Sequence, residues 1–539
     1  MTAGTPLCSR APQVKAGGSV RLYYRHGRGP VGGDSSIGSV RGRGAAISTT
    51  EERPSQELGR AARGAAVVLV GSALSALLGF AFVILLGRLL GADGSGVVLQ
   101  MVAVFTIALS IGALGLDTAA IWLLPRLRQE QPELVRPALV GMVLIGLAWS
   151  CLVVLAWYAV STFLPLDEVG STLDLAAPFL VAAVLLTIFV AGTRALGTVY
   201  PFAVIDRTLV PGLRLLLLAT GVLGTGTLAV TAAWTLPWAV GALVSLATLW
   251  VVVRRRSAPS ERLLPSRDVV RRILTFAVPR TVSNGLDQTL VWADVLIVGA
   301  LAGAAAAGMY GAAARFVFAG FIVVTALRIA VGPRFSALVG SGDRTTLSEL
   351  YSATAGWALL LGGPVYVTLA IFSPVVLGWL GDDFDGARPA MTLLCVGALV
   401  LVGAGNIQTL LIMTGRSGLV MVNKSVVVAV NIVANLVLVP RWGIEGAAVA
   451  WTASMLLDTA LAAVQVRRTT HVKLPWRPAV RVLAALTVCV AAPQLLVASV
   501  LGQTTPALAV GIAAGGVAFG AYLVLDRRHL KLDQVRARA

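Results

Sequence analysis

The stretch PRTVSNGLDQTLVWADVLIVGALAG, residues 279–303, is apolar over most of its length but carries three ionisable side chains. Arg280, Asp287 and Asp294 are spaced seven residues apart, and on an α-helix such residues differ by only about 20° in direction. Transfer of three such groups to the centre of a bilayer costs about 2.5–3.5 kcal/mol each. This cost exceeds the gain from roughly nine apolar residues, which contribute about 0.3–0.6 kcal/mol each. We therefore expect this face to contact other helices or water, and not lipid.

The composition of the whole chain indicates an integral membrane protein. The 539 residues are 57% hydrophobic and 13% charged, with a mean hydropathy of +0.85, whereas soluble domains are about 25% charged. Apolar runs long enough to cross a hydrocarbon core of about 30 Å recur about fourteen times, without the alternating polarity of a transmembrane barrel. The sequence therefore predicts an all-α polytopic membrane protein with about 14 transmembrane helices, in two six-helix lobes plus two C-terminal helices.

Basic residues alternate with acidic ones from loop to loop. The basic loops carry Arg126, Arg128 and Arg136; Arg254, Arg255, Arg256, Arg262, Arg267, Arg271 and Arg272; Arg467, Arg468, Lys473, Arg477 and Arg481; and Arg527, Arg528 and Lys531. The opposite loops carry Asp167, Glu168, Asp174, Asp382, Asp383 and Asp385. Because Lys and Arg collect in cytoplasmic loops, both termini are predicted to be cytoplasmic, in a plasma (inner) membrane. The net charge of +18 is then explained by the basic cytoplasmic loops, which also attract anionic lipids of the inner leaflet. No nucleic-acid partner is expected.

The predicted organisation follows from these spans and loops. The segments are a disordered basic cytoplasmic N-terminal tail (1–63), an N-lobe with helices 1–6 (64–256), a basic cytoplasmic linker (257–272), a C-lobe with helices 7–12 (273–466), helices 13 and 14 (467–526), and a basic cytoplasmic tail (527–539). The first residues are rich in Gly, Ser and Arg and offer little that could form a core. A misplaced start codon explains the same composition equally well.

Residue patterns typical of catalysis or metal binding are scarce. His26, His471 and His529 are far apart in the sequence, and the four cysteines form no C-x-x-C pair. There is no G-x-x-x-x-G-K-[ST] segment, so this chain is not expected to bind ATP in a phosphate loop. We therefore expect neither an enzyme nor a cofactor.

An internal repeat relates the two predicted lobes. The segment GRLLGADGSGVV (87–98) resembles VGALAGAAAAGMY (298–310), with Gly91 and Gly96 corresponding to Gly303 and Gly308. The helix after each ends in a Pro-Arg sequence, LPRL (124–127) or GPRF (332–335). Six spans separate the copies, so the lobes are expected to have the same orientation. Transporters built from such parallel repeats place their substrate site between the repeats.

These stretches, together with GALGLDTAAIWLLPRL (112–127) and LIMTGRSGLVMVNKSVVVAVNIVANLVLVPRWGIEGAAVAW (411–451), resemble the polysaccharide flippase branch of the multidrug/oligosaccharidyl-lipid/polysaccharide exporter superfamily. The resemblance covers roughly residues 64–465. It implies a V-shaped bundle of two six-helix lobes that carries a polyprenyl-pyrophosphate-linked oligosaccharide from the inner to the outer leaflet. Glycan polymerase and glycosyltransferases are the candidate protein partners that it suggests.

Such a cargo needs cations in a hydrated cavity, and arginine suits bidentate contact with phosphate. The residues predicted to line the substrate cavity are Arg280, Asn284, Asp287, Arg214, Arg328 and Arg315. Those predicted to form ion pairs or to serve structure are Asp294, Asp117 and Arg88.

Depth along the helices suggests partners for some of these side chains. Asp294 and Arg315 each lie about six residues below the outer end of their helices, which favours an ion pair between them. Asp287 lies nearest the middle of the membrane span. It is predicted either to act as a cavity or ion-coupling residue or to pair with Arg280 or Arg214. Arg280 and Arg328 lie nearer the cytoplasmic ends, where snorkelling competes with cavity lining.

Several amides and one further carboxylate lie in the C-lobe spans. Asn406, Gln408, Asn431 and Asn435 are able to bond sugars, although interhelical hydrogen bonding is their commoner role, and Asp458 is expected to be paired. An alternative function is an ion-coupled exporter of small cationic compounds from the same superfamily, and a third is a non-transporting scaffold. The excess of intramembrane Arg over Asp favours an anionic cargo.

Overall fold

The computed structural model describes residues 52–163, 167–260, 262–472 and 476–526. All regular elements among these residues are helices, as predicted from composition and hydropathy. Residues 59–539 form one contact unit, to which the following description applies. Most of the predicted N-terminal tail, all of the C-terminal tail, His26, His529 and Cys8 lie outside the described residues.

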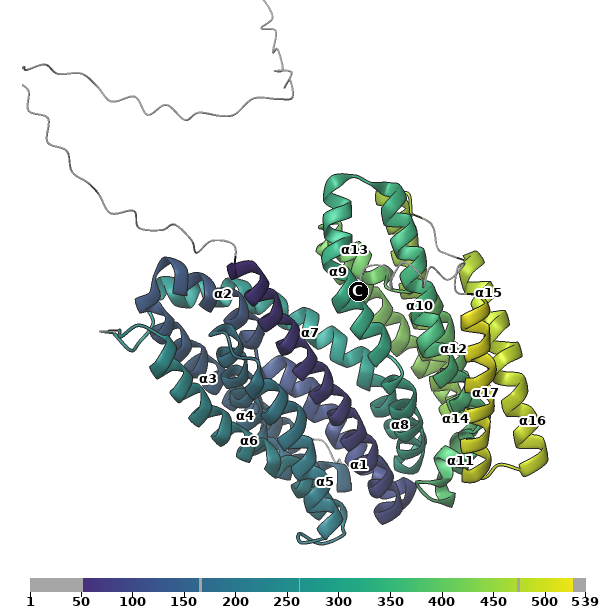
Figure 1. Ribbon diagram of the computed structural model, residues 1–539. Coiled ribbons are helices and arrows are strands. Elements are labelled where there is room, and N and C mark those ends of the chain that lie inside the picture. The colour runs from purple at the N-terminus through teal and green to yellow at the C-terminus, as the bar shows by residue number, and fades with distance from the viewer. Residues whose placement is uncertain (1–51, 164–166, 261, 473–475, 527–539) are drawn as a thin grey trace, which may run out of the picture. The chain divides into compact units, whose positions relative to one another are not determined.

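The helices are numbered along the chain in Figure 1. The first part contains α1 (Glu52–Gly112), α2 (Leu116–Glu130), η1 (Pro132–Leu134), α3 (Val135–Ser161), α4 (Asp167–Ala195), η2 (Phe202–Leu209), α5 (Val210–Thr220) and α6 (Thr227–Arg256). The second contains α7 (Arg267–Ala302), α8 (Ala304–Ala319), α9 (Ile322–Ser341), α10 (Arg344–Ile371), α11 (Ser373–Gly378), η3 (Asp382–Ala387), α12 (Arg388–Gly403), α13 (Ile407–Met413), α14 (Ser417–Thr470), α15 (Trp476–Leu486), η4 (Thr487–Ala491), α16 (Ala492–Leu501) and α17 (Thr505–Leu525).

Ten helical segments of the described chain are long and apolar enough to cross a membrane. Two of these segments include a glycine break, at Gly91 (φ 65°, ψ −169°) within α1 and at Gly443 (φ 55°, ψ −133°) within α14. Positive φ is costly for residues that carry a Cβ, so glycine permits each sharp bend, and each of these segments supplies two passes. Together with η2–α5 and α8–α9, the described residues supply about fourteen passes, in agreement with the sequence.

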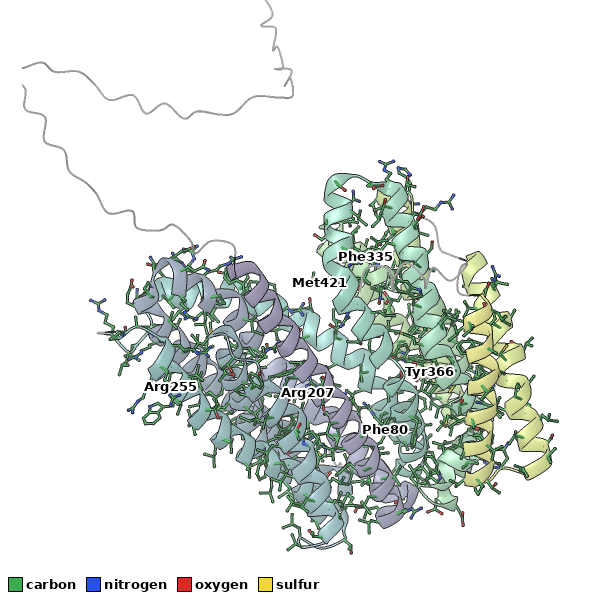
Figure 2. All side chains as sticks on the ribbon, in the orientation of Figure 1. Phe80, Arg207, Arg255, Phe335, Tyr366 and Met421 are labelled. Carbon is green, nitrogen blue, oxygen red and sulfur yellow. The ribbon has the colours of Figure 1, made fainter. Side chains whose placement is uncertain are left out.

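The helices pack as two bundles. In the first bundle, α4 lies against α2, α3 and α6, and α5 lies against α6. In the second, α12 contacts α8, α10 and α14, and the last helices, α15 to α17, pack with one another and along α10. Tyr366 of α10 is fully buried within this second bundle (Figure 2).

Helix α7 joins the two bundles. Its first third contributes Val269, Ile273 and Ala277 to an apolar cluster with α2, α3 and α4. Further along, Trp292 and Val295 belong to a different cluster, which includes α8 and α14. The helix also begins at Arg267, within the predicted linker, because hydropathy does not detect a helix that continues past the apolar span into basic residues.

The arrangement of apolar clusters differs between the two ends of the bundles. We call the end that carries Arg126, Arg254 and Arg467 the basic end, and the end that carries Glu168 and Asp383 the acidic end. One continuous cluster includes residues of both bundles and extends through the second bundle as far as Val402 and Leu486. It joins the two bundles where Phe80 of α1 lies 5.2 Å from Phe316 of α8 between ring centroids. At the basic end, the described apolar residues form separate clusters, one of the first bundle with α7 and one of the second bundle.

The repeated glycines account for the close contact at the acidic end. Gly303 has φ 91° and ψ 170°, close to the conformation of its counterpart Gly91. Gly96 and Gly308 lie against each other, and a methyl group added at Gly96 would lie only 1.7 Å from the carbonyl oxygen of Ala304. The two copies of the repeat therefore meet backbone to backbone, which only glycine allows.

Candidate functional site

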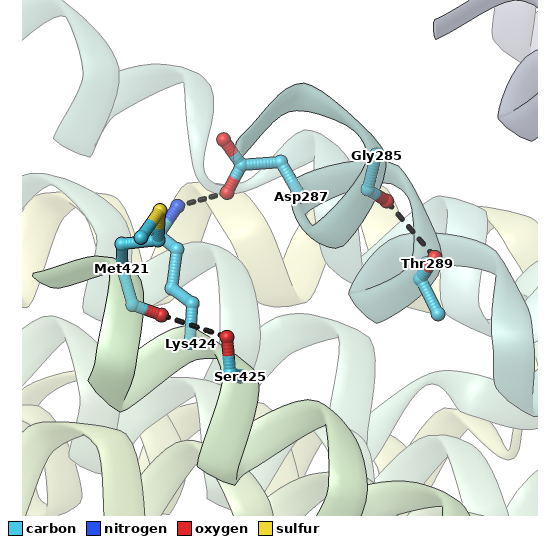
Figure 3. Close-up of polar contacts among 6 residues, drawn as sticks. All are labelled: Gly285, Asp287, Thr289, Met421, Lys424 and Ser425. Atoms are coloured by element: carbon cyan, nitrogen blue, oxygen red, sulfur yellow. Dashed lines mark hydrogen bonds and ion pairs between the residues drawn. The ribbon is translucent and has the colours of Figure 1, made fainter. Parts of the chain in front are cut away.

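The polar face of α7 meets α14 through an ion pair between Asp287 and Lys424. Figure 3 shows the Lys424 ammonium group reaching from α14 to the Asp287 carboxylate on α7. The two side chains are 42% and 27% exposed, so the pair is neither sealed in protein nor fully open. The sequence prediction offered Arg280 or Arg214 as the partner of Asp287 and missed Lys424, which is the partner that the structure shows.

Further charged groups surround this ion pair. Arg280, two turns before Asp287 on α7, is exposed and interacts electrostatically with Lys424, as does Asp458 of α14. The backbone of α7 at Arg280 is held against the junction of α1 and α2, because a methyl group at Gly115 would lie 3.1 Å from the Cβ of Arg280. Asn284 is partly buried on the same helix. The structure thus brings Arg280 and Asp287 together with two charged residues of α14.

A cavity lies within the second bundle, next to this charged group. Its volume is about 170 Å³, and it lies between α9, the junction of α12 with α13, and α14. The polar residues in its lining are Arg328, Asn406, Gln408, Asp458, Thr325, Thr409 and Thr459. Arg328 therefore lines a cavity, and Asp458 connects this cavity to Lys424 through their electrostatic interaction.

Asp294 has different partners from those predicted. It is buried, and it accepts hydrogen bonds from the Tyr310 hydroxyl at 3.0 Å and from Nδ2 of Asn435 at 2.7 Å. The guanidinium of Arg315 instead lies 3.5 Å from the ring centroid of Trp292. The predicted ion pair between Asp294 and Arg315 is therefore wrong. Tyr310 and Arg315 are five residues apart on α8, about 140° in direction, so only one of them can face Asp294.

The remaining predicted residues lie outside the charged group around Lys424. Arg214 of α5 donates from Nε to the carbonyl oxygen of Trp234 at 3.0 Å and stacks on Trp234 and Trp238, with distances of 4.1 and 4.7 Å to the ring centroids. Arg88 donates from Nε to the carbonyl oxygen of Trp379 at 2.7 Å, which links α1 to the segment after α11. Asp117 accepts from the Thr118 hydroxyl at 3.3 Å.

A second charged group, in the first bundle, was missed from the sequence. Asp206 and Arg207 lie in the π-helix η2 and form an ion pair at 3.2 Å, and Arg194 interacts electrostatically with both. Both Arg194 and Arg207 also stack on Phe202, at 4.5 and 4.9 Å. These charges lie at the start of an apolar run, where averaging over a membrane-length window conceals them. π-Helices are frequent at functional sites, so the π-helical form of η2 is further evidence for a site here, and it is visible only in the structure.

Two helical bundles joined by α7, with charged side chains where α7 meets α14, define a two-lobed polytopic membrane transporter. A family model described as polysaccharide biosynthesis protein matches residues 61–339, which is more than half of the chain. The chain belongs to this family, and the predicted membership in the flippase branch of the exporter superfamily is confirmed. A second model, MatE, matches residues 279–437.

One curated protein is similar to part of the chain. The chain is 24% identical over 205 residues to the probable low-salt glycan biosynthesis flippase Agl15 of Haloferax volcanii, a match that covers 36% of this chain and 42% of that protein. The chain therefore spans less than half the length of this curated relative.

Solved structures show the same fold. The lipid II flippase MurJ in an inward closed conformation has a TM-score of 0.66 at 12% identity, over 86% of this chain and 99% of that one. A MOP superfamily transporter from Pyrococcus furiosus has a TM-score of 0.55 at 15% identity, over 79% and 96% of the two chains.

Proposed function

We propose that this protein is a flippase that moves a polyprenyl-pyrophosphate-linked oligosaccharide from the inner to the outer leaflet of the plasma membrane by alternating access between its two bundles. The observation that carries the proposal is the ion pair between Lys424 and Asp287. Lys424 is held by a carboxylate that is itself 42% exposed, so an incoming phosphate can replace Asp287 as its partner. Arg280 adds a further cation beside it, and Arg328 lines the neighbouring cavity.

The packing of the bundles is consistent with a conformation that accepts the cargo from the cytoplasmic side. Contacts at the acidic end join the two bundles, through Gly96 against Ala304 and through Arg88 against Trp379. At the basic end the apolar clusters of the two bundles are separate. By the positive-inside rule the basic end is cytoplasmic, so this conformation would admit a cargo from the inner leaflet. Release on the other side requires the contacts at the acidic end to part.

The names of relatives and the charges agree with this proposal. Agl15 is described as a probable glycan biosynthesis flippase and MurJ as a lipid II flippase. In this scheme glycosyltransferases build the cargo on the cytoplasmic side and a polymerase uses it outside. No step in the scheme needs a bond in the cargo to be made or broken by this chain.

The test is complementation of a host in which the gene is deleted. Lys424→Met and Arg280→Ala should weaken binding of the cargo, and Asp287→Ala should prevent its release, because no carboxylate then displaces the phosphate from Lys424. Each variant should therefore abolish surface glycan and accumulate its lipid-linked precursor inside, at unchanged protein level. The matched control is Arg441→Met, because Arg441 is an exposed cation of the same helix whose Nη1 donates to the carbonyl oxygen of Val437 in its own preceding turn. Normal surface glycan in the Lys424 and Asp287 variants would contradict the assignment of this site.

The alternative function is an ion-coupled exporter of small cationic compounds. The match of the MatE model to residues 279–437 favours it, because that range contains both Asp287 and Lys424. A cationic cargo would be attracted to Asp287 and repelled by Lys424, so Lys424→Met would preserve or improve export. Resistance of the complemented host to cationic dyes, measured for wild type and Lys424→Met, separates the two functions.

A further inference from the structure

We propose that the cavity between α9, the α12–α13 junction and α14 is a subsite for one sugar residue of the cargo, the residue attached directly to the pyrophosphate. This inference rests on the proposed function, and it adds where the first sugar binds and which side chains recognise it. The residues that carry it are Asn406, Gln408 and Asp458, with Phe321 as an apolar wall.

The size of the cavity suits one small polar group. A single water needs only about 10–15 Å³ measured in a comparable way, so a volume of about 170 Å³ is roughly an order of magnitude larger than a water site. Pockets for drug-sized ligands are about 300–1,000 Å³, so a whole oligosaccharide does not fit. One monosaccharide unit lies between these limits, with the rest of the glycan outside.

The chemistry of the lining selects among possible ligands. Among the described residues, Nδ2 of Asn406, Oε1 of Gln408 and Oδ1 of Asp458 are buried without a hydrogen-bond partner, and Asn406 as a whole is only 4% exposed. Gln408 uses its other end, because its Nε2 donates to the backbone carbonyl oxygen of Asp458 at 3.4 Å. Buried polar atoms in proteins are nearly always hydrogen bonded, so three in one cavity call for a ligand. The set contains one donor and two acceptors. Sugar hydroxyl groups both donate and accept, so they match the whole set.

Other small ligands match the set less well. A metal ion or an ammonium group would satisfy Gln408 and Asp458 but would be repelled by the N–H groups of Asn406. A phosphate group would accept from Asn406 and be attracted by Arg328, but it would be repelled by the Asp458 carboxylate and would leave the acceptor oxygens of Gln408 and Asp458 without a donor. The rest of the lining is apolar and includes Phe321, Val324 and Met455, which suits the C–H faces of a pyranose ring.

The position of the cavity agrees with the order of groups in the cargo. Arg328 lies in the lining, and Lys424 interacts electrostatically with Asp458 on the same helix. In the proposed arrangement, the anomeric phosphate of the bound sugar would be directed toward Lys424 and Arg328. Thr325 and Arg328 are exposed, so the cavity is open to ligands from its α9 side.

The experiment measures binding of defined lipids to the full chain in lipid nanodiscs. The probes are polyprenyl pyrophosphate alone and the same lipid carrying one N-acetylglucosamine, N-acetylgalactosamine, glucose or galactose. At least one sugar-bearing probe should bind about 10-fold more tightly than the bare lipid, as expected for a few net hydrogen bonds. Gln408→Leu should remove this ratio and leave the affinity for the bare lipid unchanged. Lys424→Met should weaken all probes by a similar factor and preserve the ratio.

Two further variants distinguish a loss of sugar binding from misfolding. Gln494→Leu is matched to Gln408→Leu, because Gln494 is also buried with an unpartnered Oε1 but lies against Thr368, away from the cavity, and it should leave the ratio intact. If Gln408→Leu lowers the unfolding temperature, Asp458→Asn provides the second variant, which should also reduce the ratio.

The possible outcomes separate the two proposals. If no sugar raises the affinity, or if Gln408→Leu weakens bare and sugar-bearing lipids equally, the sugar subsite is overturned while the flippase proposal stands. A sodium-dependent rise in unfolding temperature that Gln408→Leu removes, without any sugar effect, would assign the cavity to a cation and also overturn the subsite. If bare polyprenyl pyrophosphate does not bind, or binds equally to Lys424→Met, the proposed function itself fails.

Discussion

The Lys424 and Asp287 pair gives a prediction in which two mutations of one contact have opposite effects on ligand binding. In this conformation the Asp287 carboxylate forms an ion pair with the Lys424 ammonium group. If a phosphate replaces Asp287, the carboxylate is a competitor of the ligand. Lys424→Met should then weaken binding of polyprenyl pyrophosphate, whereas Asp287→Asn should strengthen it, because the ammonium group is left free.

The magnitudes follow from the exposure of the pair. A hydrogen bond to a charged group contributes about 1.5–3 kcal/mol, so Lys424→Met should raise the Kd roughly 10- to 150-fold. Breaking a buried ion pair costs about 3–5 kcal/mol and breaking an exposed one about 0–1 kcal/mol. With side chains 27% and 42% exposed, each single mutation should lower the free energy of unfolding by about 1–2 kcal/mol. The double mutant should recover most of this loss, because neither charge is then left unpaired.

The assay is a double-mutant cycle in nanodiscs, with ligand titration for the Kd and thermal unfolding for stability. Arg441→Met, on the same helix, serves as the control for loss of a cation. The reasoning is refuted if Asp287→Asn weakens binding as Lys424→Met does, since Asp287 would then contact the cargo or organise the site and would not compete with the ligand. It is also refuted if the stability losses of the two single mutants simply add in the double mutant.

Three further predictions concern the helices that position this site. Gly96→Ala would place a methyl group 1.7 Å from the Ala304 carbonyl oxygen, so it should separate α1 from α8 at the acidic end and increase labelling of a cysteine there by an impermeant reagent; unchanged labelling would contradict the tight contact. Asp294→Leu removes the acceptor of the Tyr310 hydroxyl and one of the two acceptors of Nδ2 of Asn435, so it should lower the free energy of unfolding by about 2–4 kcal/mol, whereas Asp294→Asn should cost less than about half of that; equal losses would argue against the hydrogen bonds. Gly303→Ala at φ 91° should cost about 1–3 kcal/mol although the space around it is open, whereas Gly285→Ala, in a regular part of α7 with equally open surroundings, should cost nothing; similar unfolding temperatures would exclude backbone strain at Gly303.

Features that depend on one segment alone were predictable from the sequence. Hydropathy predicted the helical class and about fourteen passes, because each span carries its own apolar pattern. The glycine repeat correctly paired Gly91 with Gly303, since a required positive φ is a local property and both residues have it. The seven-residue spacing likewise identified the polar face of α7, on which Asp287 and Asp294 have polar partners from α14.

Partners across helices were not predictable, because they depend on how far each helix is rotated and shifted against its neighbour. Lys424 lies in an apolar stretch 137 residues from Asp287, and nothing in either stretch indicates their common depth. Arg315 and Asp294 match in depth but not in direction, and an aromatic ring, Trp292, takes the guanidinium instead. Helix α7 begins at Arg267, before the predicted span of 273–300, and Val269 in this extension packs against the first bundle.

The most direct test of the account is translocation by the purified chain in proteoliposomes. A polyprenyl-pyrophosphate-linked oligosaccharide with a fluorescent label on the glycan is added to the cytoplasmic face, and label that has crossed is protected from an impermeant quencher. We predict that wild type and Arg441→Met translocate the lipid, and that Lys424→Met binds it more weakly and fails to translocate it. Equal protection with wild type, Lys424→Met and vesicles without protein would contradict the proposed function.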